Sequence, residues 1–275
     1  MEQKDKSGQK KEDEKDLLPE GGGVTAENGR ECFYCLNVIG EIEGHTVQES
    51  SRKTTKYEHL IPLLFALEED ERIDGILILL NTMGGDVEAG LAISEVIASL
   101  DKPTVSVVLG GGHSIGVPLA VSAKRSFIVP SATMTVHPVR TTGTVISAPQ
   151  SFAYLREMQD RIVRFVVDHS HIKRAEFERV MMRTDVMAND IGSVLDGEAA
   201  VKCGLIDGIG GIREALAALR EMAGIPAPTQ KRPSRAPADG ATPANGADHA
   251  DGATPANGAT PADGETAGNG GTPSP

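Results

Sequence analysis

Residues 75–86 read GILILLNTMGGD. The segment 75–80 is apolar throughout, which is the pattern of a strand buried on both faces. Residues 104–109, TVSVVL, show a similar pattern. Between these two runs, residues 87–100 place their apolar side chains at helical spacing on one broad face. A buried strand, a helix and another buried strand in this order predict parallel pairing and an α/β domain.

The same pattern extends over the middle of the chain. We expect further strands over residues 32–38, 126–129, 133–137 and 205–206. We expect further helices over residues 56–67, 114–123, 152–169, 174–182, 197–203 and 212–222. Repeated strand-then-helix units of this kind favour an α/β fold.

Both ends of the 275-residue chain have compositions that do not support a packed core. Residues 1–30 hold six basic and eight acidic residues and few apolar ones, so we expect a disordered charged arm. Residues 226–275 hold nine of the 16 prolines and a hexad repeat of GATPA followed by Asn or Asp, which also indicates disorder. The remaining segment, residues 31–225, has the size of one compact domain.

The overall charge argues against one large class of function. The chain carries 27 basic and 39 acidic residues, a net charge of −12, and it has no Trp. Affinity for nucleic acids rests on cationic contacts to phosphate, so a nucleic-acid binder is not expected. The sequence shows no apolar run long enough to span a bilayer and no secretory leader. We therefore expect a cytoplasmic protein that does not span a membrane.

The cysteines and histidines form weak metal or redox motifs. Cys32 and Cys35 have redox or zinc spacing, but a zinc site needs two further ligands and only one other cysteine exists. Because the two lie in a strand-like run, a buried and inert pair is the favoured interpretation. Residues 168–171, DHSH, could bind a metal, but their polar surroundings at a helix end favour solvated side chains. We expect neither a metal nor another cofactor.

Three short segments carry groups suited to catalysis. Gly84 and Gly85 follow the first buried strand, and paired glycines there allow positive φ and can present amides to an anion. Ser114 lies among glycines where a helix is predicted to begin, a position that stabilises negative charge, although a serine there can also be a simple N-cap. His137 ends a short strand and is followed by Pro138. It could be a general base or a structural histidine.

Taken together, these segments resemble the ClpP family of serine peptidases. The family motifs read roughly N-S-P-G-G, A-S-M-G and M-I-H-Q-P, and this chain has NTMGG at 81–85, HSIG at 113–116 and TVHP at 135–138. The stretch 195–211, LDGEAAVKCGLIDGIGG, resembles the family's closing L-S-A-x-E-A-x-x-Y-G-L-I-D. The resemblance covers about residues 33–215. Within the family it is greatest to the TepA (translocation-enhancing protein) branch, in which a His precedes the Ser.

The resemblance implies a role for each matching residue. Ser114 would be the nucleophile, and His137 would be the base that takes its proton. The backbone amides of Gly85 and Ile115 would form the oxyanion hole, which stabilises the charge that develops on the scissile carbonyl. The resemblance therefore implies a serine endopeptidase that works through an acyl-enzyme.

The third member of the triad is matched less directly. An ungapped alignment puts Gly192 where the family has its Asp, and a glycine cannot serve. Two extra residues in the alignment bring Asp190 into place, and Asp185 is the reserve candidate. The resemblance therefore implies Asp190 as the catalytic acid.

Three further positions depart from the family pattern. Met83 stands where the family often has Pro, and Pro138 directly follows His137, where a Gln usually intervenes. His113 stands beside the nucleophile, and adjacent side chains at a sharp turn point apart. We therefore expect His113 to shape the cleft rather than to act as the base. If the departures together spoil the geometry, the domain would bind peptides without cutting them.

The resemblance also implies an architecture and partners. The fold would be the ClpP/crotonase-like β-spiral of stacked βαβ units, with a projecting helical arm within residues 150–184. In the family this arm interlocks two rings of subunits, so a homo-oligomeric ring acting on polypeptide substrates is expected. The chain has no G-x-x-x-x-G-K-[ST] sequence, so any ATP-driven unfoldase would be a separate partner. The TepA-like branch is associated with protein export, which suggests precursor or signal-peptide remnants as substrates.

Other functions remain open at this point. Residues 112–116, GHSIG, also match the G-x-S-x-G elbow of α/β-hydrolases, but a Ser–His–Asp order along the chain fits the ClpP-like arrangement better. A crotonase-like acyl-CoA enzyme would share the fold and would not depend on Ser114. A non-catalytic scaffold of the export machinery would keep its role without Ser114 and His137.

Overall fold

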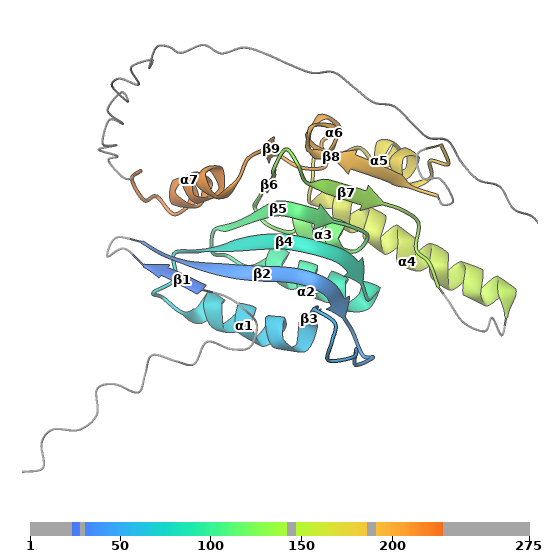
Figure 1. The fold of residues 1–275 in the computed structure, drawn as a ribbon, viewed down its shortest axis with the longest axis horizontal. Helices are drawn as coiled ribbons and strands as arrows, with labels where there is room; N and C mark the ends of the chain where they lie inside the picture. Colours follow the sequence, from blue (N-terminus) through green and yellow to red (C-terminus); the bar gives the residue numbers. More distant parts are fainter. Residues whose placement is uncertain (1–23, 28–30, 142–146, 186–190, 228–275) are drawn as a thin grey trace, which may run out of the picture. The chain divides into compact units, whose positions relative to one another are not determined.

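In the computed structural model, the apolar runs of the sequence form one largely parallel sheet (Figure 1). Its main strands are β1 Val24–Glu27, β2 Cys32–Glu43, β3 Thr54–Lys56, β4 Gly75–Gly85, β5 Thr104–Gly112, β6 Arg125–Ile128 and β9 Gly208–Ile209. The strand order is β1-β2-β4-β5-β6-β9, and all neighbours in it except β1 and β2 pair in parallel. The predicted α/β class is therefore confirmed.

The structure describes residues 24–27, 31–141, 147–185 and 191–227. All of them belong to one structural unit, Met1–Thr229, and the second unit, Gln230–Pro275, lies outside the described residues. The hexad repeat and most of the N-terminal arm fall outside this description too. Within the expected arm, however, Val24–Glu27 form the edge strand β1, which composition did not predict.

Two further strands lie off the main strand order and bring the segments of Ser114 and His137 close together. They are β7 Thr133–Val136 and β8 Ser193–Asp196. β7 pairs with the end of β5 at a single position, Gly111 opposite Thr133. β8 then runs antiparallel along the whole of β7. As a result, the residues that follow β5 and those that follow β7 meet at the carboxyl end of the sheet.

Helices cover both faces of the sheet and extend beyond it (Figure 1). They are α1 Tyr57–Glu69, α2 Val87–Ser99, α3 Gly116–Val121, α4 Ala148–Asp168, α5 Arg174–Met181, α6 Gly197–Lys202 and α7 Ile212–Met222. α1, α2 and α3 enclose the larger core on one face, where Leu36, Ile78 and Leu119 are fully buried. α7 covers the other face and buries Leu77, Val107 and Leu219 in a smaller core.

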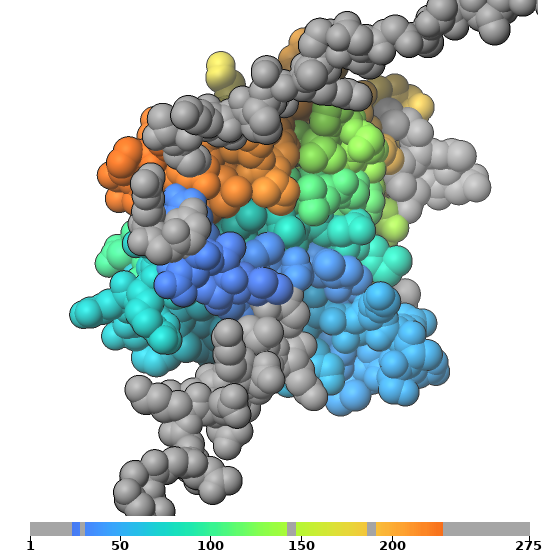
Figure 2. Space-filling view, turned by 60° about the vertical axis from the view of Figure 1, so that its left-hand side comes forward, coloured from blue at the N-terminus to red at the C-terminus, as the bar shows by residue number. Residues whose placement is uncertain are grey.

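The first strands and the last helix of the described residues lie next to each other on this smaller core. Figure 2 shows the orange segment that includes α7 lying against the blue segment of β1 and β2. The Arg220 guanidinium donates two hydrogen bonds to the Glu31 carboxylate, each 2.7 Å long. Both side chains are largely buried, so the pair fastens α7 to the first residues of the fold.

Differences from the predicted elements lie at short strands, at strand ends and at helix ends: α4 begins four residues before the predicted start at 152, and α3 is shorter than the predicted helix over 114–123. The strand expected over 205–206 is wrong: Leu205 and Ile206 are buried, and their amides donate to the Ala200 carbonyl in a turn. β9 lies three residues farther on, at Gly208–Ile209. β3 and β8 are too short for a periodic signal, and β4 and β5 continue through polar and glycine residues because neighbouring backbones pair with them.

Candidate active site

The turn at the end of β4 is tightly packed behind Ser114. Gly84 has φ +95°, and a Cβ atom there would lie 2.6 Å from the Ser114 Cβ. Gly85 has φ +149°, and its Cβ would lie 2.3 Å from the Ile42 carbonyl oxygen. Thr82 fixes the turn, since its hydroxyl donates to the Gly40 carbonyl at 2.6 Å and accepts from the Gly84 amide at 3.0 Å. Only glycine fits at both positions.

Ser114 occupies a sharp left-handed turn between β5 and α3. Its φ is +57°, and it is the one non-glycine residue with positive φ in the part of the chain that the structure describes. The Ser114 amide donates to the Thr135 carbonyl at 2.8 Å, and the His113 amide donates to the Thr82 carbonyl at 3.1 Å. α3 begins only at Gly116, and its N-cap residue is Ile115. Ser114 is therefore not the N-cap that the sequence left open, and backbone strain of this kind is typical of functional residues.

His137 follows β7 directly and is held by its own neighbour. Its Nδ1 atom lies 2.7 Å from the Pro138 carbonyl oxygen. A carbonyl can only accept a hydrogen bond, so Nδ1 is the donor and carries a proton. In the neutral ring the lone pair then lies on Nε2, the atom that a general base needs.

Gly192 packs closely against the backbone of Val136 and His137. Its φ is +142°, and a Cβ atom there would lie 2.5 Å from the Val136 carbonyl oxygen and 2.9 Å from the His137 Cβ. The Gly192 amide donates to the Arg183 carbonyl at 2.7 Å. Gly192 is the residue that an ungapped alignment puts at the position of the family's Asp. Because it has no side chain, the chain leading into β8 can approach His137 closely.

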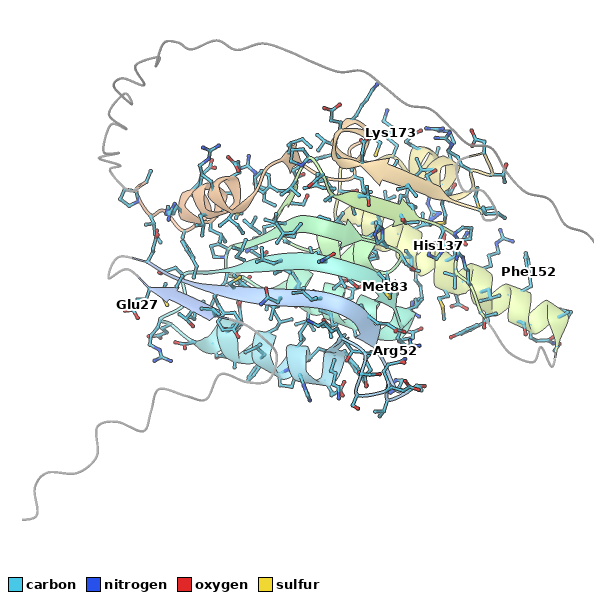
Figure 3. The ribbon with its side chains drawn as sticks, in the orientation of Figure 1. Glu27, Arg52, Met83, His137, Phe152 and Lys173 are labelled. Atoms are coloured by element: carbon cyan, nitrogen blue, oxygen red, sulfur yellow. The ribbon has the colours of Figure 1, made fainter. Side chains whose placement is uncertain are left out.

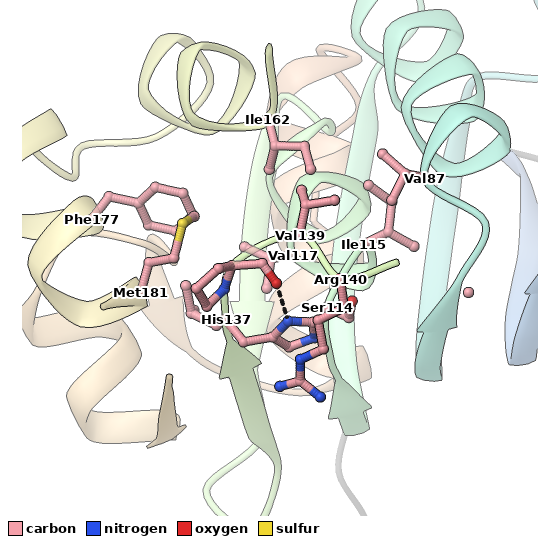
Figure 4. A pocket seen from close by; sticks show the side chains of 13 residues that line it. Val87, Ser114, Ile115, Val117, His137, Val139, Arg140, Ile162, Phe177 and Met181 are labelled. Carbon is pink, nitrogen blue, oxygen red and sulfur yellow. Dashed lines mark hydrogen bonds between the residues drawn. The ribbon is translucent and has the colours of Figure 1, made fainter. Parts of the chain in front are cut away.

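Four of the five predicted site residues line one cavity of about 180 Å³ (Figure 4). These are Ser114, His137, Gly85 and Ile115. Apolar side chains form much of the remaining wall; they are Val87, Val117, Val139, Ile162, Phe177 and Met181. Within the described residues, the Ser114 and His137 side chains do not hydrogen bond to each other, and the Ile115 amide has no acceptor. The cavity thus brings together a hydroxyl, an imidazole and a free amide donor.

The proposed acid is not placed by the structure. Asp190 lies outside the described residues. The reserve candidate, Asp185, forms an ion pair with Arg183 at 2.9 Å, does not line the cavity, and has a 69 % exposed side chain. The hydrogen bond from Arg183 lowers the pKa of the Asp185 carboxyl. Asp185 is therefore paired with Arg183, and the described contacts do not include a hydrogen bond between it and His137.

The two adjacent residues 113 and 114 face different spaces, as the sequence predicts. His113 lines an open groove together with Asn81, Met83 and Lys53, and Ser114 lines the enclosed cavity. The His113 Nδ1 lies 2.9 Å from the Thr135 hydroxyl. Burial lowers the pKa of the His113 imidazole. Figure 3 shows Met83 and His137 at the same end of the sheet, far from Glu27 at its other end.

The remaining motifs show ordinary structural environments. Cys32 and Cys35 are free, partly buried thiols of β2, and burial raises the pKa of both. His169 stacks on Phe165 with the ring centroids 4.1 Å apart. Over residues 24–27, 31–141, 147–185 and 191–227, no cluster of three His, Cys, Asp or Glu side chains could hold a metal ion. Nor does any helix in those segments have the length and apolar character needed to cross a membrane.

Several contributors to the site were not predicted. Thr82 and Thr135 hold the Ser114 turn, and Ile162 and Phe177 come from α4 and α5, far along the chain. The alternation of polar and apolar residues in 133–136 was the only available signal for Thr135, because it places that side chain on the less buried face of the strand.

Comparisons with known proteins find one matching family model and several similar chains. The family model described as Clp protease matches residues 37–213. The translocation-enhancing protein TepA of Halalkalibacterium halodurans is 55 % identical over 190 residues, which cover 69 % of this chain and 74 % of that protein. The ATP-dependent Clp protease proteolytic subunit 1 of Chlamydia muridarum is 28 % identical over 155 residues, 54 % of this chain and 77 % of that protein. A proteolytic subunit from Leuconostoc citreum is 28 % identical over 112 residues, 40 % of this chain and 56 % of that protein.

Proposed function

Because the chain belongs to the Clp protease family, we propose that it is a serine endopeptidase that cleaves peptide bonds through an acyl-enzyme on Ser114. The observation that carries the proposal is the shared cavity: Ser114 and His137 are 23 positions apart in the chain and line the same small space. A strained serine, a histidine with its Nδ1 proton fixed and a free amide are the groups that acyl transfer requires.

In the proposed reaction, the Ser114 hydroxyl attacks the scissile carbonyl carbon while its proton moves to Nε2 of His137. The carbonyl oxygen becomes an oxyanion, which the amides of Gly85 and Ile115 stabilise. The C–N bond then breaks, and His137 returns the proton to the leaving amine. A water molecule repeats the attack on the ester carbon, which releases the acid and restores Ser114.

The Pro138 carbonyl supports this proposal because it keeps the proton on Nδ1 and leaves Nε2 able to accept. We assign the role of the acid to Asp190, which would stabilise the imidazolium that forms during the attack. The apolar walls of the cavity favour a substrate with an apolar side chain beside the cleaved bond.

The proposal extends to assembly and cellular role. On α4, Phe152 and Tyr154 are 68 % and 57 % exposed, although Phe165 and Val166 on the same helix are buried. An exposed apolar helix end of this kind supports a homo-oligomer, expected as a mass well above 28.9 kDa in light scattering. The similarity to a protein named as translocation-enhancing supports a role on precursor or signal-peptide remnants in the cytoplasm, with any ATP-driven unfoldase a separate protein.

Labelling with a fluorophosphonate probe tests the proposal. We expect one covalent adduct, mapped by peptide mass spectrometry to Ser114, and hydrolysis of unfolded polypeptide by the unlabelled protein. Ser114→Ala should abolish both, whereas Ser131→Ala, a change at an exposed serine, should abolish neither. An adduct that persists in Ser114→Ala would place the nucleophile elsewhere. Turnover of an acyl-CoA that does not depend on Ser114 would favour a crotonase-like enzyme instead.

A further inference from the structure

The segments that carry Ser114 and His137 are joined by few contacts. Ser114 follows β5 and His137 follows β7, yet the ladder between these strands contains one residue pair, Gly111 opposite Thr133. β7 obtains most of its pairing from β8 on its other side. The distance between the Ser114 hydroxyl and the His137 ring therefore depends on the contacts between the Ser114 turn and β7.

Two consecutive residues of the turn bind the same residue of β7. The Ser114 amide donates to the Thr135 carbonyl at 2.8 Å. The His113 Nδ1 lies 2.9 Å from the Thr135 hydroxyl. The His113 amide also donates to the Thr82 carbonyl at 3.1 Å, which connects the turn to β4. Of these three contacts, the one to the Thr135 hydroxyl depends on both side chains.

The surroundings of His113 fix its ring in this orientation. A Cβ atom on Gly111 would lie 2.5 Å from the His113 Nε2, so a glycine there leaves the space that the ring fills. The ring is half-buried and faces the open groove rather than the cavity of Ser114. His113 therefore does not line the cavity that holds Ser114 and His137.

We propose that His113 is a positioning residue, which acts through the Thr135 hydroxyl to hold the Ser114 turn against β7 and so sets the distance from Ser114 to His137. This inference rests on the proposed function, since it assigns His113 a part in the same reaction. It also explains a departure of this chain from the family motif, where Ala precedes the nucleophile.

The test compares near-isosteric changes at Thr135. Thr135→Val keeps the shape and removes the hydroxyl, and Thr135→Ser keeps the hydroxyl. We expect the rate of fluorophosphonate labelling and kcat for peptide hydrolysis to fall about ten- to hundredfold in Thr135→Val, with KM unchanged, because small misplacements of reacting groups cost this much. Thr135→Ser should keep at least about a third of both rates. Thr133→Val is the matched control, because Thr133 lies on the same face of β7 and its hydroxyl makes no hydrogen bond to a described residue.

Changes at His113 complete a double-mutant cycle. His113→Leu should lower the labelling rate as much as Thr135→Val, and the double variant should be no slower than either single variant. His113→Asn, whose amide can replace Nδ1 as a hydrogen-bonding group, should restore most of the rate. Additive losses, or equal rates for the Asn and Leu variants, would overturn the proposal.

A readout without turnover separates this inference from the proposed function. Hydrogen exchange of the Ser114 amide should become faster in Thr135→Val than in Thr133→Val, because that amide donates to the Thr135 carbonyl. Unchanged exchange would contradict the positioning role. If exchange changes but the unmodified protein never labels at Ser114, then the contact between His113 and Thr135 does hold the Ser114 turn, and the peptidase proposal is wrong.

Discussion

At the amino ends of β4 and β5 the outer face of the sheet packs against α7, whereas at their carboxyl ends the same face is open. Leu77 and Val107 are buried beneath α7, but Ile39 and Leu109, farther along the same face, are 44 % and 39 % exposed. The closed end is apolar and fastened by a buried ion pair. The open end holds glycines with positive φ and a strained serine.

The two ends of the sheet therefore have different roles, one in stability and the other in reactivity. Apolar burial at the closed end supplies folding free energy, and close backbone packing at the open end fixes the positions of reacting groups at some cost in strain. Substitutions at the open end should therefore change reactivity more than stability, and substitutions at the closed end should do the reverse.

The largest effect is expected for Gly84→Ala. The new Cβ would approach the Ser114 Cβ to 2.6 Å in a backbone conformation that L-residues rarely adopt. The rate of fluorophosphonate labelling should fall about hundredfold or more, because the Ser114 turn must shift. Gly224→Ala is the matched control: its φ is +68°, but the added atom meets nothing within 4 Å. Labelling of Gly84→Ala at an unchanged rate would show that the turn is not rigid.

A smaller effect, on stability alone, is expected at the closed end. Arg220→Met removes the two hydrogen bonds that the guanidinium donates to the largely buried Glu31 carboxylate, which should lower the free energy of unfolding by about 3 kcal/mol. Denaturant unfolding measures this loss, and the labelling rate of the folded fraction should not change. Arg72→Met, which breaks the ion pair between Asp70 and an 86 % exposed arginine, should cost much less, because water screens an exposed pair. Equal losses in the two variants would contradict the difference in burial.

The smallest effect concerns the start of α7 and depends on pH. Glu214 accepts a hydrogen bond from the Gly211 amide at 2.9 Å and another from the Arg213 side chain at 2.8 Å, and together they lower the pKa of the carboxyl to about 2, from an ordinary value of 4.5. A lowered folded-state pKa stabilises the fold above pH 4.5, and the stabilisation is lost as the pH falls toward 2. Glu214→Gln should therefore lower Tm slightly at pH 7, and the difference in Tm should shrink between pH 5 and pH 3. A difference that stays constant over this range would rule out the titration of Glu214 as its cause.

The sequence predicts the closed end better than the open one. The buried runs at 75–80 and 104–109 identify β4 and β5, and residues 212–222 match α7, because apolar periodicity records burial directly. At the open end, motif resemblance placed Ser114, His137, Gly85 and Ile115, which line one cavity.

The rest of the site depends on tertiary contacts that leave little trace in local sequence. β8 is four residues long, and its pairing with β7 brings Gly192 against His137 across 55 positions of the chain. The contact between His113 and Thr135 likewise joins the turn after β5 to β7, and the ladder between those two strands has one pair. Neither contact has a period or a spacing that the sequence alone could reveal.

A crystal structure of the protein after reaction with a fluorophosphonate tests the central claim most directly. The phosphoryl group, bonded to Ser114 Oγ, should place one oxygen within hydrogen-bonding distance of the Gly85 and Ile115 amides, and His137 Nε2 should face Oγ. An adduct on another residue, or one whose oxygen points into solvent with His137 turned away, would contradict it.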